Sequence, residues 1–183
     1  GLQLEYEELE DGTVEITKFV SSTSTDIELP SVIDGKSVTS IGDKAFNADD
    51  IEACKNLTSI IIPESVTSIG SYAFCWCTSL TSVIIPDSVT SIGYYAFQNC
   101  TSLTDVTIPD SVTSIGDGTF ECCTGLTSVT IPDSVTSIGD YAFFSCSGLA
   151  SITIPDSVTS IGRSAFYNCT SLTSVMIPDS VTK

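Results

Sequence analysis

The stretch Asp87–Pro109, DSVTSIGYYAFQNCTSLTDVTIP, decides the fold because the chain repeats it. Five copies of this 23-residue pattern follow one another from Glu64 to Pro178 without insertion or deletion, and DSVTK at 179–183 begins a further copy. Self-similarity at a fixed period of this length predicts a solenoid, a row of stacked coils in which each coil contacts only its neighbours.

The copy at 110–132 shows how one coil is built. Leu126, Val129 and Ile131 follow the pattern LxxVxI, which predicts a short strand with its apolar side chains turned inward. Pro132 ends this strand, because proline cannot donate a ladder hydrogen bond. Stacking the copies therefore predicts a parallel sheet made of one such strand from each coil.

The other half of the same copy predicts a second wall and a turn. Val112 and Ile115 mark a second short extended segment, and we expect Gly116 to turn the chain with a positive φ. Phe120 and Cys123 lie three residues apart, which favours a single 3₁₀ or helical turn that brings both side chains into the core.

The residues before the regular copies predict a cap and a transition unit. Residues 1–28 do not follow the repeat, and their alternating pattern on both sides of a Glu-Asp-Gly turn predicts a β-hairpin that covers the first coil. The repeat domain is expected at 29–183, with an irregular first unit at 29–63, five regular repeats at 64–178 and a truncated repeat at 179–183. The irregular unit carries two insertions, the first with a turn at Ile33–Lys36.

Composition narrows the class of partner. The chain has 23 Asp and Glu against 6 Lys and Arg, a formal net charge of −17, which disfavours nucleic acid and anionic membrane surfaces. Its hydrophobic content of 42% is enough for a continuous core. No apolar run is long enough to insert into a membrane, and no signal peptide is visible in the sequence.

Six of the eight cysteines occupy one repeat position, and we expect them to form a buried column of free thiols. They are Cys54, Cys77, Cys100, Cys123, Cys146 and Cys169. Cys75 and Cys122 fall outside this column and are the two candidates for exposed thiols.

The pattern I-P-x-S-V-T-S-I-G-x-x-A-F-x-x-C-x-x-L-T-S-V resembles the BspA-like, or Treponema-type, leucine-rich repeat over about residues 29–182. The resemblance implies a curved leucine-rich-repeat solenoid of right-handed, β-rich coils, with short parallel strands on the concave side. It also implies a secreted or cell-surface bacterial protein, since several members of the family are adhesins that bind host matrix proteins or other cells.

The chain offers no visible catalytic constellation, and we expect it not to be an enzyme. It contains no His, which excludes Ser-His-Asp and Cys-His arrangements and histidine-bound metals. The column Asp87, Asp110, Asp133, Asp156 and Asp179, with Glu64 in line, could be taken for a calcium ladder, but each coil supplies only one acid. We expect each Asp instead to accept a hydrogen bond from the amide two residues on, and we expect no metal and no cofactor.

Candidate partner-binding residues are those at which the copies differ. Outward positions of the concave strand include Ile61, Ile84, Asp105, Thr107 and Met176, with the two isoleucines adjacent in the stack. The variable turn positions carry Trp76, Tyr94, Phe144 and Tyr167, and aromatic residues are favoured at recognition surfaces. Trp76 and Phe144 would form an exposed patch. The alternative is that rings such as Tyr72, Tyr95 and Tyr141 only cover the turn of a neighbouring coil.

These observations support two hypotheses. The first is a non-enzymatic binding or adhesion module that recognises a protein or glycan ligand, on host matrix or another cell, through the concave sheet or the variable turns. The alternative is a structural spacer or self-associating segment of a larger surface protein, with end-to-end association through the last repeat.

Overall fold

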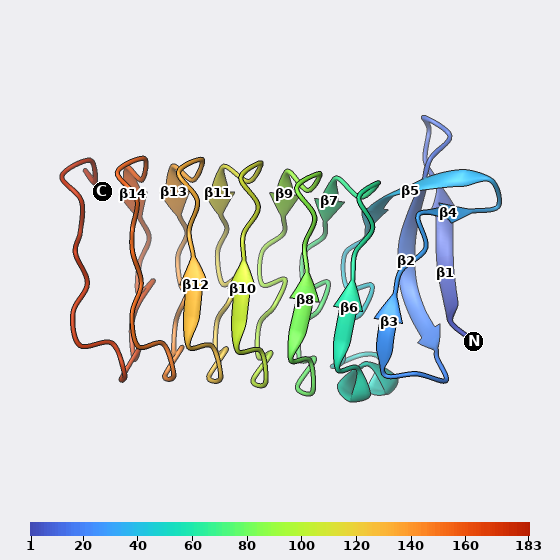
Figure 1. Cartoon of the computed structure of the whole chain (residues 1–183), viewed down its shortest axis with the longest axis horizontal. Helices are drawn as coiled ribbons and strands as arrows, with labels where there is room; N and C mark the ends of the chain where they lie inside the picture. Colours follow the sequence, from blue (N-terminus) through green and yellow to red (C-terminus); the bar gives the residue numbers. More distant parts are fainter.

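Figure 1 shows the chain as a row of stacked coils, with its two termini at opposite ends of the row. The computed structural model describes all residues from 1 to 183. Each regular coil contains a front segment, a bend at its proline, a second short strand, and a back turn that leads to the next front segment. The front segments are strands up to β12 and extended chain without strand pairing at 151–153 and 174–176. Paired strands of successive regular coils are parallel and offset by one repeat, so the predicted solenoid is confirmed.

Two sets of parallel strands run along the row. The front sheet contains β3 (Asp26–Glu28), β6 (Ser59–Ile61), β8 (Ser82–Ile84), β10 (Asp105–Thr107) and β12 (Ser128–Thr130). The second sheet contains β2 (Val14–Ser21), β5 (Lys36–Ile41), β7 (Ser68–Ile69), β9 (Ser91–Ile92), β11 (Ser114–Ile115), β13 (Ser137–Ile138) and β14 (Ser160–Ile161). The remaining elements are β1 (Gln3–Glu8), β4 (Val32–Ile33) and the 3₁₀ helix η1 (Glu52–Asn56). The structure has no helix with the length and apolarity that a bilayer span requires.

The N-terminal hairpin is present, and its second strand also belongs to the solenoid. β1 pairs antiparallel with β2, while β2 pairs in parallel with β5 and β3 pairs in parallel with β6. Phe19 of β2 stacks on Phe46 with ring centroids 5.6 Å apart. Residues before 29 thus already form the first coil, and a division of the chain at residue 28 stays a prediction.

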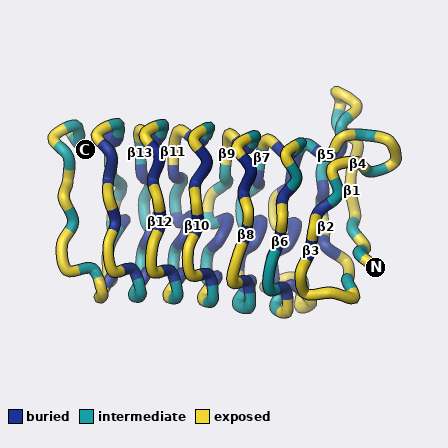
Figure 2. Tube along the Cα trace, in the orientation of Figure 1, coloured by how far each residue is buried: buried dark blue, intermediate teal, exposed yellow.

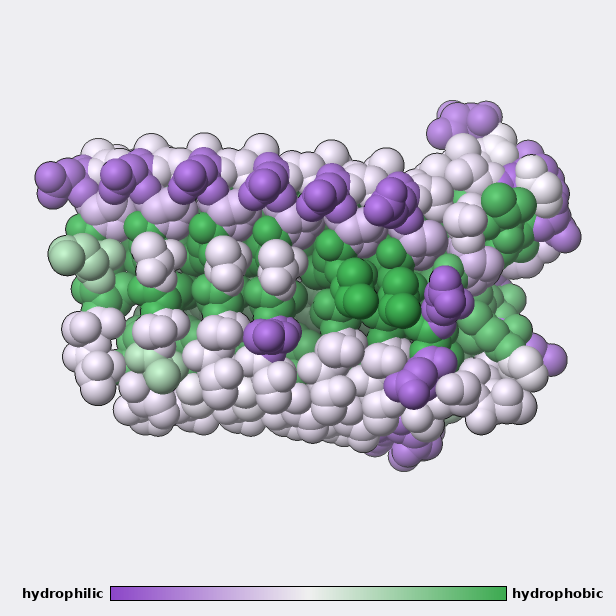
Figure 3. Space-filling view, viewed as in Figure 1, coloured by the Kyte–Doolittle hydropathy of each residue, from purple (hydrophilic) through white to green (hydrophobic).

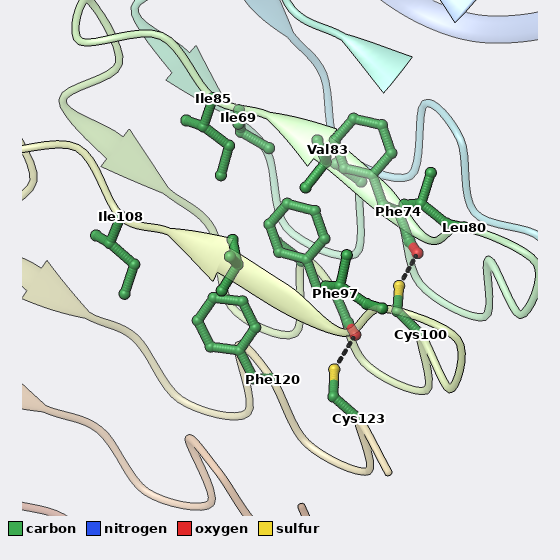
Figure 4. Packing of buried hydrophobic residues seen from close by; sticks show 14 of the residues in the cluster. Ile69, Phe74, Leu80, Val83, Ile85, Phe97, Cys100, Ile108, Phe120 and Cys123 are labelled. Carbon is green, nitrogen blue, oxygen red and sulfur yellow. Dashed lines mark hydrogen bonds between the residues drawn. The ribbon is translucent and has the colours of Figure 1, made fainter. Parts of the chain in front are cut away.

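The core is a column of phenylalanines, one from each coil. Phe46, Phe74, Phe97 and Phe120 are fully buried, and successive rings lie 5.2–5.7 Å apart. Figure 4 shows three of these rings between the isoleucines and leucines of the two walls. Buried residues recur along the row in every coil but the last, which is coloured intermediate and exposed (Figure 2). Because every coil adds the same ring at the same place, the core is continuous from coil to coil, and it thins in the last regular repeat, where Phe166, Leu172 and Val175 are partly buried.

The predicted cysteine column is confirmed, and its thiols connect the coils. Five of the six thiols, all but that of Cys54, donate to the backbone carbonyl of the phenylalanine in the preceding coil, as for Cys100 to Phe74 and Cys123 to Phe97, both at 3.1 Å (Figure 4). All eight cysteines are free. The weak thiol donor thus satisfies a carbonyl oxygen that also accepts an amide from its own turn.

One of the two thiols predicted to be exposed is not. Cys75 is buried and its Sγ lies 3.2 Å from Oε1 of Gln98 in the next coil, whereas Cys122 is half-buried. Burial raises the pKa of Cys75 to about 12, with smaller contributions from the carboxylates of Asp49 and Glu121. Cys75 lies at a turn position that faces the neighbouring coil, and the sequence of a single repeat does not show this contact.

The expectation of a positive φ at Gly116 is wrong. The left-handed residues lie two positions after this glycine and two after Phe120, at Gly118 (φ 62°) and Cys122 (φ 60°). The repeated glycine is required for another reason. A Cβ on Gly139 would lie 2.6 Å from the backbone nitrogen of Asp117 in the preceding coil, so this position lets two coils approach closely.

The back turn follows the predicted geometry without forming a helix. The Cys123 amide donates to the Phe120 carbonyl at 3.1 Å, a 3₁₀-type bond, but η1 in the irregular unit is the chain's 3₁₀ helix. At the proline bend, the expected Asp-to-amide bond is absent. The Val89 amide donates instead to the Pro86 carbonyl at 3.1 Å, and Asp87 is exposed.

Both sheets are interrupted at one place, which we name the central junction, between coil 82–104 and coil 105–127. β8 does not pair with β10, and β9 does not pair with β11. The Thr127 amide donates to Thr104 at 2.9 Å, but the equivalent bond from Thr104 to Thr81 is missing. The back turns remain joined here, for example by the Phe97 amide donating to the Thr119 carbonyl at 3.0 Å. The junction lies within the front surface on which candidate residues were predicted.

Candidate functional site

The front sheet presents alternate side chains to solvent, as the LxxVxI pattern predicts. In β8, β10 and β12 the central valine is buried and the two flanking residues are exposed. Most outward side chains on this surface are Ser or Thr, which appear as the pale residues across the face in Figure 3. Outward positions that carry other residue types are therefore candidates for a specific function.

The main departure is an apolar pair near the N-terminal end. Ile61 of β6 and Ile84 of β8 are directly paired in register, and their exposed fractions are 42% and 58%. The same outward position carries Thr107 and Thr130 in β10 and β12. Figure 3 shows an apolar area on this side of the face, with hydrophilic residues beside it. The two isoleucines are therefore a local feature and not a requirement of the repeat.

A hollow of about 240 Å³ adjoins this pair at the central junction. Its lining includes Ile84, Asp105 and Thr107, so the structure brings three of the predicted residues together. The missing pairing of β8 and β10 also uncovers the core slightly. Val83 and Ile85 are 8% and 9% exposed, whereas the corresponding Ile60 and Ile62 of the preceding coil are 0% and 2% exposed.

Acidic side chains flank the apolar pair. Glu28 of β3 pairs in register with Ile61, and Asp105 lies on the opposite side, in β10. Asp26, also of β3, accepts hydrogen bonds from Ser59 at 2.7 Å and Thr58 at 2.8 Å, and these bonds lower the pKa of its carboxyl group. Neither of the chain's two salt bridges involves these three carboxylates.

Sequence reasoning missed Asp26 and Glu28 because residues 1–28 were assigned to a cap. The signal was present, since TDIELP at 25–30 matches TSVIIP at 81–86 in its spacing of Thr, inward apolar residues and Pro. β3 occupies the front sheet for that reason.

The aromatic candidates lie elsewhere and do not form one patch. Phe144 is half-buried and stacks on the exposed Tyr167, with ring centroids 5.4 Å apart. Trp76 is 41% exposed but occupies another repeat position in a distant coil, so the expected Trp76–Phe144 patch is wrong. Tyr94 is exposed beside the central junction, where its ring faces Gly116.

The structure also places Met176 and the tyrosines of the turns. Met176, 85% exposed, lies in the last coil, far along the row from Ile61. Tyr72 stacks on Tyr95 at 5.1 Å, and Tyr95 covers Gly118 of the next coil, which matches the alternative that these rings cover neighbouring turns.

A second concavity, of about 460 Å³, lies on the outer surface of the second sheet. Its lining is mostly polar and includes Glu15, Asp43, Ser68 and Ser91. Glu15 accepts a hydrogen bond from the buried Ser40 at 2.8 Å. Neither this groove nor the front surface holds three or more residues of the kinds that bind metals in one cluster.

The comparisons with known proteins agree with this architecture. The BspA type Leucine rich repeat region family matches residues 12–149 in 6 copies. The crystal structure of a Treponema pallidum leucine-rich repeat protein aligns with a TM-score of 0.89 and 33% identity, over 96% of this chain and 80% of its own. No curated protein matches the chain.

Two longer relatives add context. A leucine-rich cell surface protein of Faecalibacterium prausnitzii aligns with a TM-score of 0.68 and 35% identity, over 96% of this chain and 54% of its own. A leucine-rich repeat protein of Eubacterium ventriosum aligns with a TM-score of 0.77 and 28% identity, over 97% of this chain and 47% of its own. This chain thus spans about half the length of both.

Leucine-rich repeats generally mediate protein interactions, and the matches indicate no enzymatic family. The family match covers most of the chain and extends through the coils that form the front surface. Together with the sequence pattern and the stacked coils, it identifies the chain as a member of the BspA-type leucine-rich repeat family.

Proposed function

We propose that this protein is a non-enzymatic binding module displayed on the surface of a bacterium or secreted from it, and that it recognises a protein partner through the front sheet. The observation that carries the proposal is the exposed pair Ile61 and Ile84 on a face whose other outward side chains are mostly Ser and Thr, with acidic residues on both sides of the pair. Exposed apolar area rimmed by polar residues is a mark of protein interaction sites. The cell-surface description of the F. prausnitzii relative supports the location.

The test is a selection of peptides from a displayed random library on the immobilised full chain. The key variant is Ile61→Thr with Ile84→Thr, because threonine occupies this position in β10 and β12 and should leave the coils intact. We expect enriched peptides to lose about ten-fold or more in affinity for this variant, as truncation of central interface residues typically causes. Met176→Thr, at the far end of the row, is the matched control and should change nothing.

Peptides that bind the double variant as well as the unchanged protein would overturn the front sheet as the site. A spacer or self-associating role predicts a different result. In that case no peptide is enriched, and light scattering shows a mass that rises with protein concentration.

A glycan is the second candidate partner, favoured by the polar groove on the second sheet. Hydroxyl and carboxylate side chains there offer hydrogen-bond donors and acceptors to a polyhydroxylated ligand. Ser91→Trp would fill the groove, whereas Ser114→Trp, at the same repeat position one coil on, would not. Binding on a glycan array that only Ser91→Trp abolishes would support this candidate, and binding unaffected by Ser91→Trp would exclude the groove.

A further inference from the structure

The chemistry of the partner can be narrowed from the charges around the apolar pair, given the proposed binding role of the front sheet. Glu28 stands one strand to the N-terminal side of Ile61, and Asp105 stands one strand to the C-terminal side of Ile84. Outward positions of the front strands carry no Lys or Arg. The apolar pair therefore lies between two carboxylates that no cation of this chain neutralises.

The hollow beside Ile84 gives an apolar side chain a place to bind. Its lining combines the buried Val83, Ile85 and Val106 with exposed residues that include Ile84 and Asp105. A second hollow of about 240 Å³ lies between β12 and residues 151–153, but its rim carries only Ser and Thr. The hollow at the central junction differs from it, because its lining includes the exposed Ile84 and the carboxylate of Asp105.

The spacing sets the length of the recognised segment. Hydrogen-bonded strands lie about 4.8 Å apart, so the two paired steps from β3 to β8 cover about 10 Å, and the unpaired step to β10 brings the distance to at least about 14 Å. Asp105 is offset from Glu28 by about 7 Å along the strands. Four residues of an extended chain span about 13 Å, and long basic side chains cover the remaining distance. Residues i, i+2 and i+4 of such a chain face the same side.

We propose that the front sheet binds an extended segment of a partner protein with the pattern basic-x-apolar-x-basic. The apolar side chain packs on Ile61 and Ile84 and enters the hollow at the central junction. The two basic side chains pair with Glu28 and Asp105. The net charge of −17 favours the approach of such a segment over an acidic one.

The probe is a nine-residue capped peptide, GSKGLGKSG, titrated into the full chain and followed by amide chemical shifts at low and high salt. We expect the largest shifts at residues 59–61, 82–85 and 105–107, and an affinity that falls with salt because exposed charges are screened. Replacing the peptide leucine by serine, or both lysines by glutamate, should each weaken binding about ten-fold or more.

Matched protein variants test each part of the site. The double variant Glu28→Gln with Asp105→Ser should weaken binding and remove most of its salt dependence, because it removes both carboxylates of the site. Serine replaces Asp105 because β8 and β12 carry serine at that position. Glu64→Gln with Asp110→Asn removes the same charge from exposed bends outside the site and should leave binding unchanged.

Equal binding of the lysine and glutamate peptides, or shifts confined to other coils, would overturn the inference. The proposed function would survive if library peptides of another pattern still depended on Ile61 and Ile84. It would fall together with the inference if neither the library nor the probe gave binding that depends on these residues.

Discussion

The back turns and the two sheets use the same 23-residue repeat, yet only the back turns are continuous along the row. At the central junction the turns keep their backbone ladder, with the Tyr95 amide bonded to Asp117 at 2.9 Å and the Asn99 amide bonded to Glu121 at 2.9 Å. Both sheets lose their pairing there. The difference shows that coil-to-coil adhesion depends more on the turns and the phenylalanine column than on the short strands.

Tyr94 lies where the sheets separate. At the position after the repeated glycine, Asp43, Asp117 and Asp140 each accept a hydrogen bond from the next coil, as Asp117 does from the Asp140 amide at 2.8 Å. Ser71 accepts none, although β7 still pairs with β9. Tyr94 has no such acceptor, and its ring stands against Gly116 instead. At the proline bend, the Ser111 hydroxyl donates a hydrogen bond to the Asp87 carbonyl across the junction, at 2.7 Å. The two coils are therefore joined at the proline bend as well as at the back turns.

The largest expected effect follows from breaking the phenylalanine column at the junction. Phe97 is fully buried, and its ring stacks on Phe74 and, at the widest spacing of the column, on Phe120 at 5.7 Å. We expect Phe97→Ala to lower the free energy of unfolding by about 3–5 kcal/mol, through lost burial and the cavity left behind. Urea unfolding followed by circular dichroism measures this loss.

Phe144→Ala is the control for that experiment, since Phe144 is half-buried outside the column and should cost less. Because a repeat protein can unfold in segments, Phe97→Ala should also separate the transition into two steps. A single transition with a loss below about 1 kcal/mol would show that the strands, and not the column, connect the two halves.

The next largest effect is the loss of stability on replacing a repeated glycine by alanine, compared between two glycines at the same repeat position. A Cβ at Gly139 would meet the Asp117 backbone nitrogen at 2.6 Å, but at Gly116 it would meet the Tyr94 ring at 2.9 Å. The exposed Tyr94 ring can rotate away from an added methyl group, whereas the Asp117 backbone cannot move without shifting its coil. We therefore expect Gly139→Ala to destabilise the protein by about 1–3 kcal/mol, as overpacking does, and Gly116→Ala by less. Equal losses in urea unfolding would contradict the assignment of the junction as the looser contact.

These positions also show which features of the structure could be predicted from the sequence and which could not. The period and the LxxVxI pattern determine which side chains enter the core, because burial alternates within each strand regardless of its neighbours. The contact between coils is different. The role of Gly139, the burial of Cys75 and the gap at Tyr94 depend on how closely adjacent coils approach, and one copy of the repeat holds no information on that distance.

The candidate site was predictable to a similar extent. Ile61 and Ile84 could be assigned to neighbouring outward positions from the period alone. The hollow beside them could not, since it arises from missing hydrogen bonds at the central junction. Glu28 was missed because its strand belongs to a segment whose resemblance to the repeat is short.

A smaller effect should come from repairing the junction. Tyr94→Asn supplies an acceptor for the Asp117 amide without adding charge, and the tyrosine ring it removes is 58% exposed. We expect a gain of about 0.5–1.5 kcal/mol, the usual contribution of one hydrogen bond. Hydrogen exchange provides the local measurement, because the unpaired amides of Thr104 and Gly116 should become protected while those of Thr127 and Gly139 stay unchanged. Faster exchange at Thr104 in the variant would mean that Tyr94 holds the junction together.

The smallest expected effect is in cysteine labelling, which tests whether the back turns remain in contact at the central junction. Brief treatment of the native protein with iodoacetamide at pH 8 should modify Cys122 before any other cysteine, since it alone of the eight is not buried. Its reaction should still be slow, because burial and the nearby Glu121 carboxylate raise the pKa of Cys122. Its neighbour Cys123, which donates to Phe97 across the junction, should resist until the protein unfolds. Mass spectrometry of the digested protein locates the label, and labelling in guanidinium provides the control in which all eight react. Modification of Cys123 at the rate of Cys122 would show that the coils separate at the turns as well as at the strands, which would remove the distinction between the two regions.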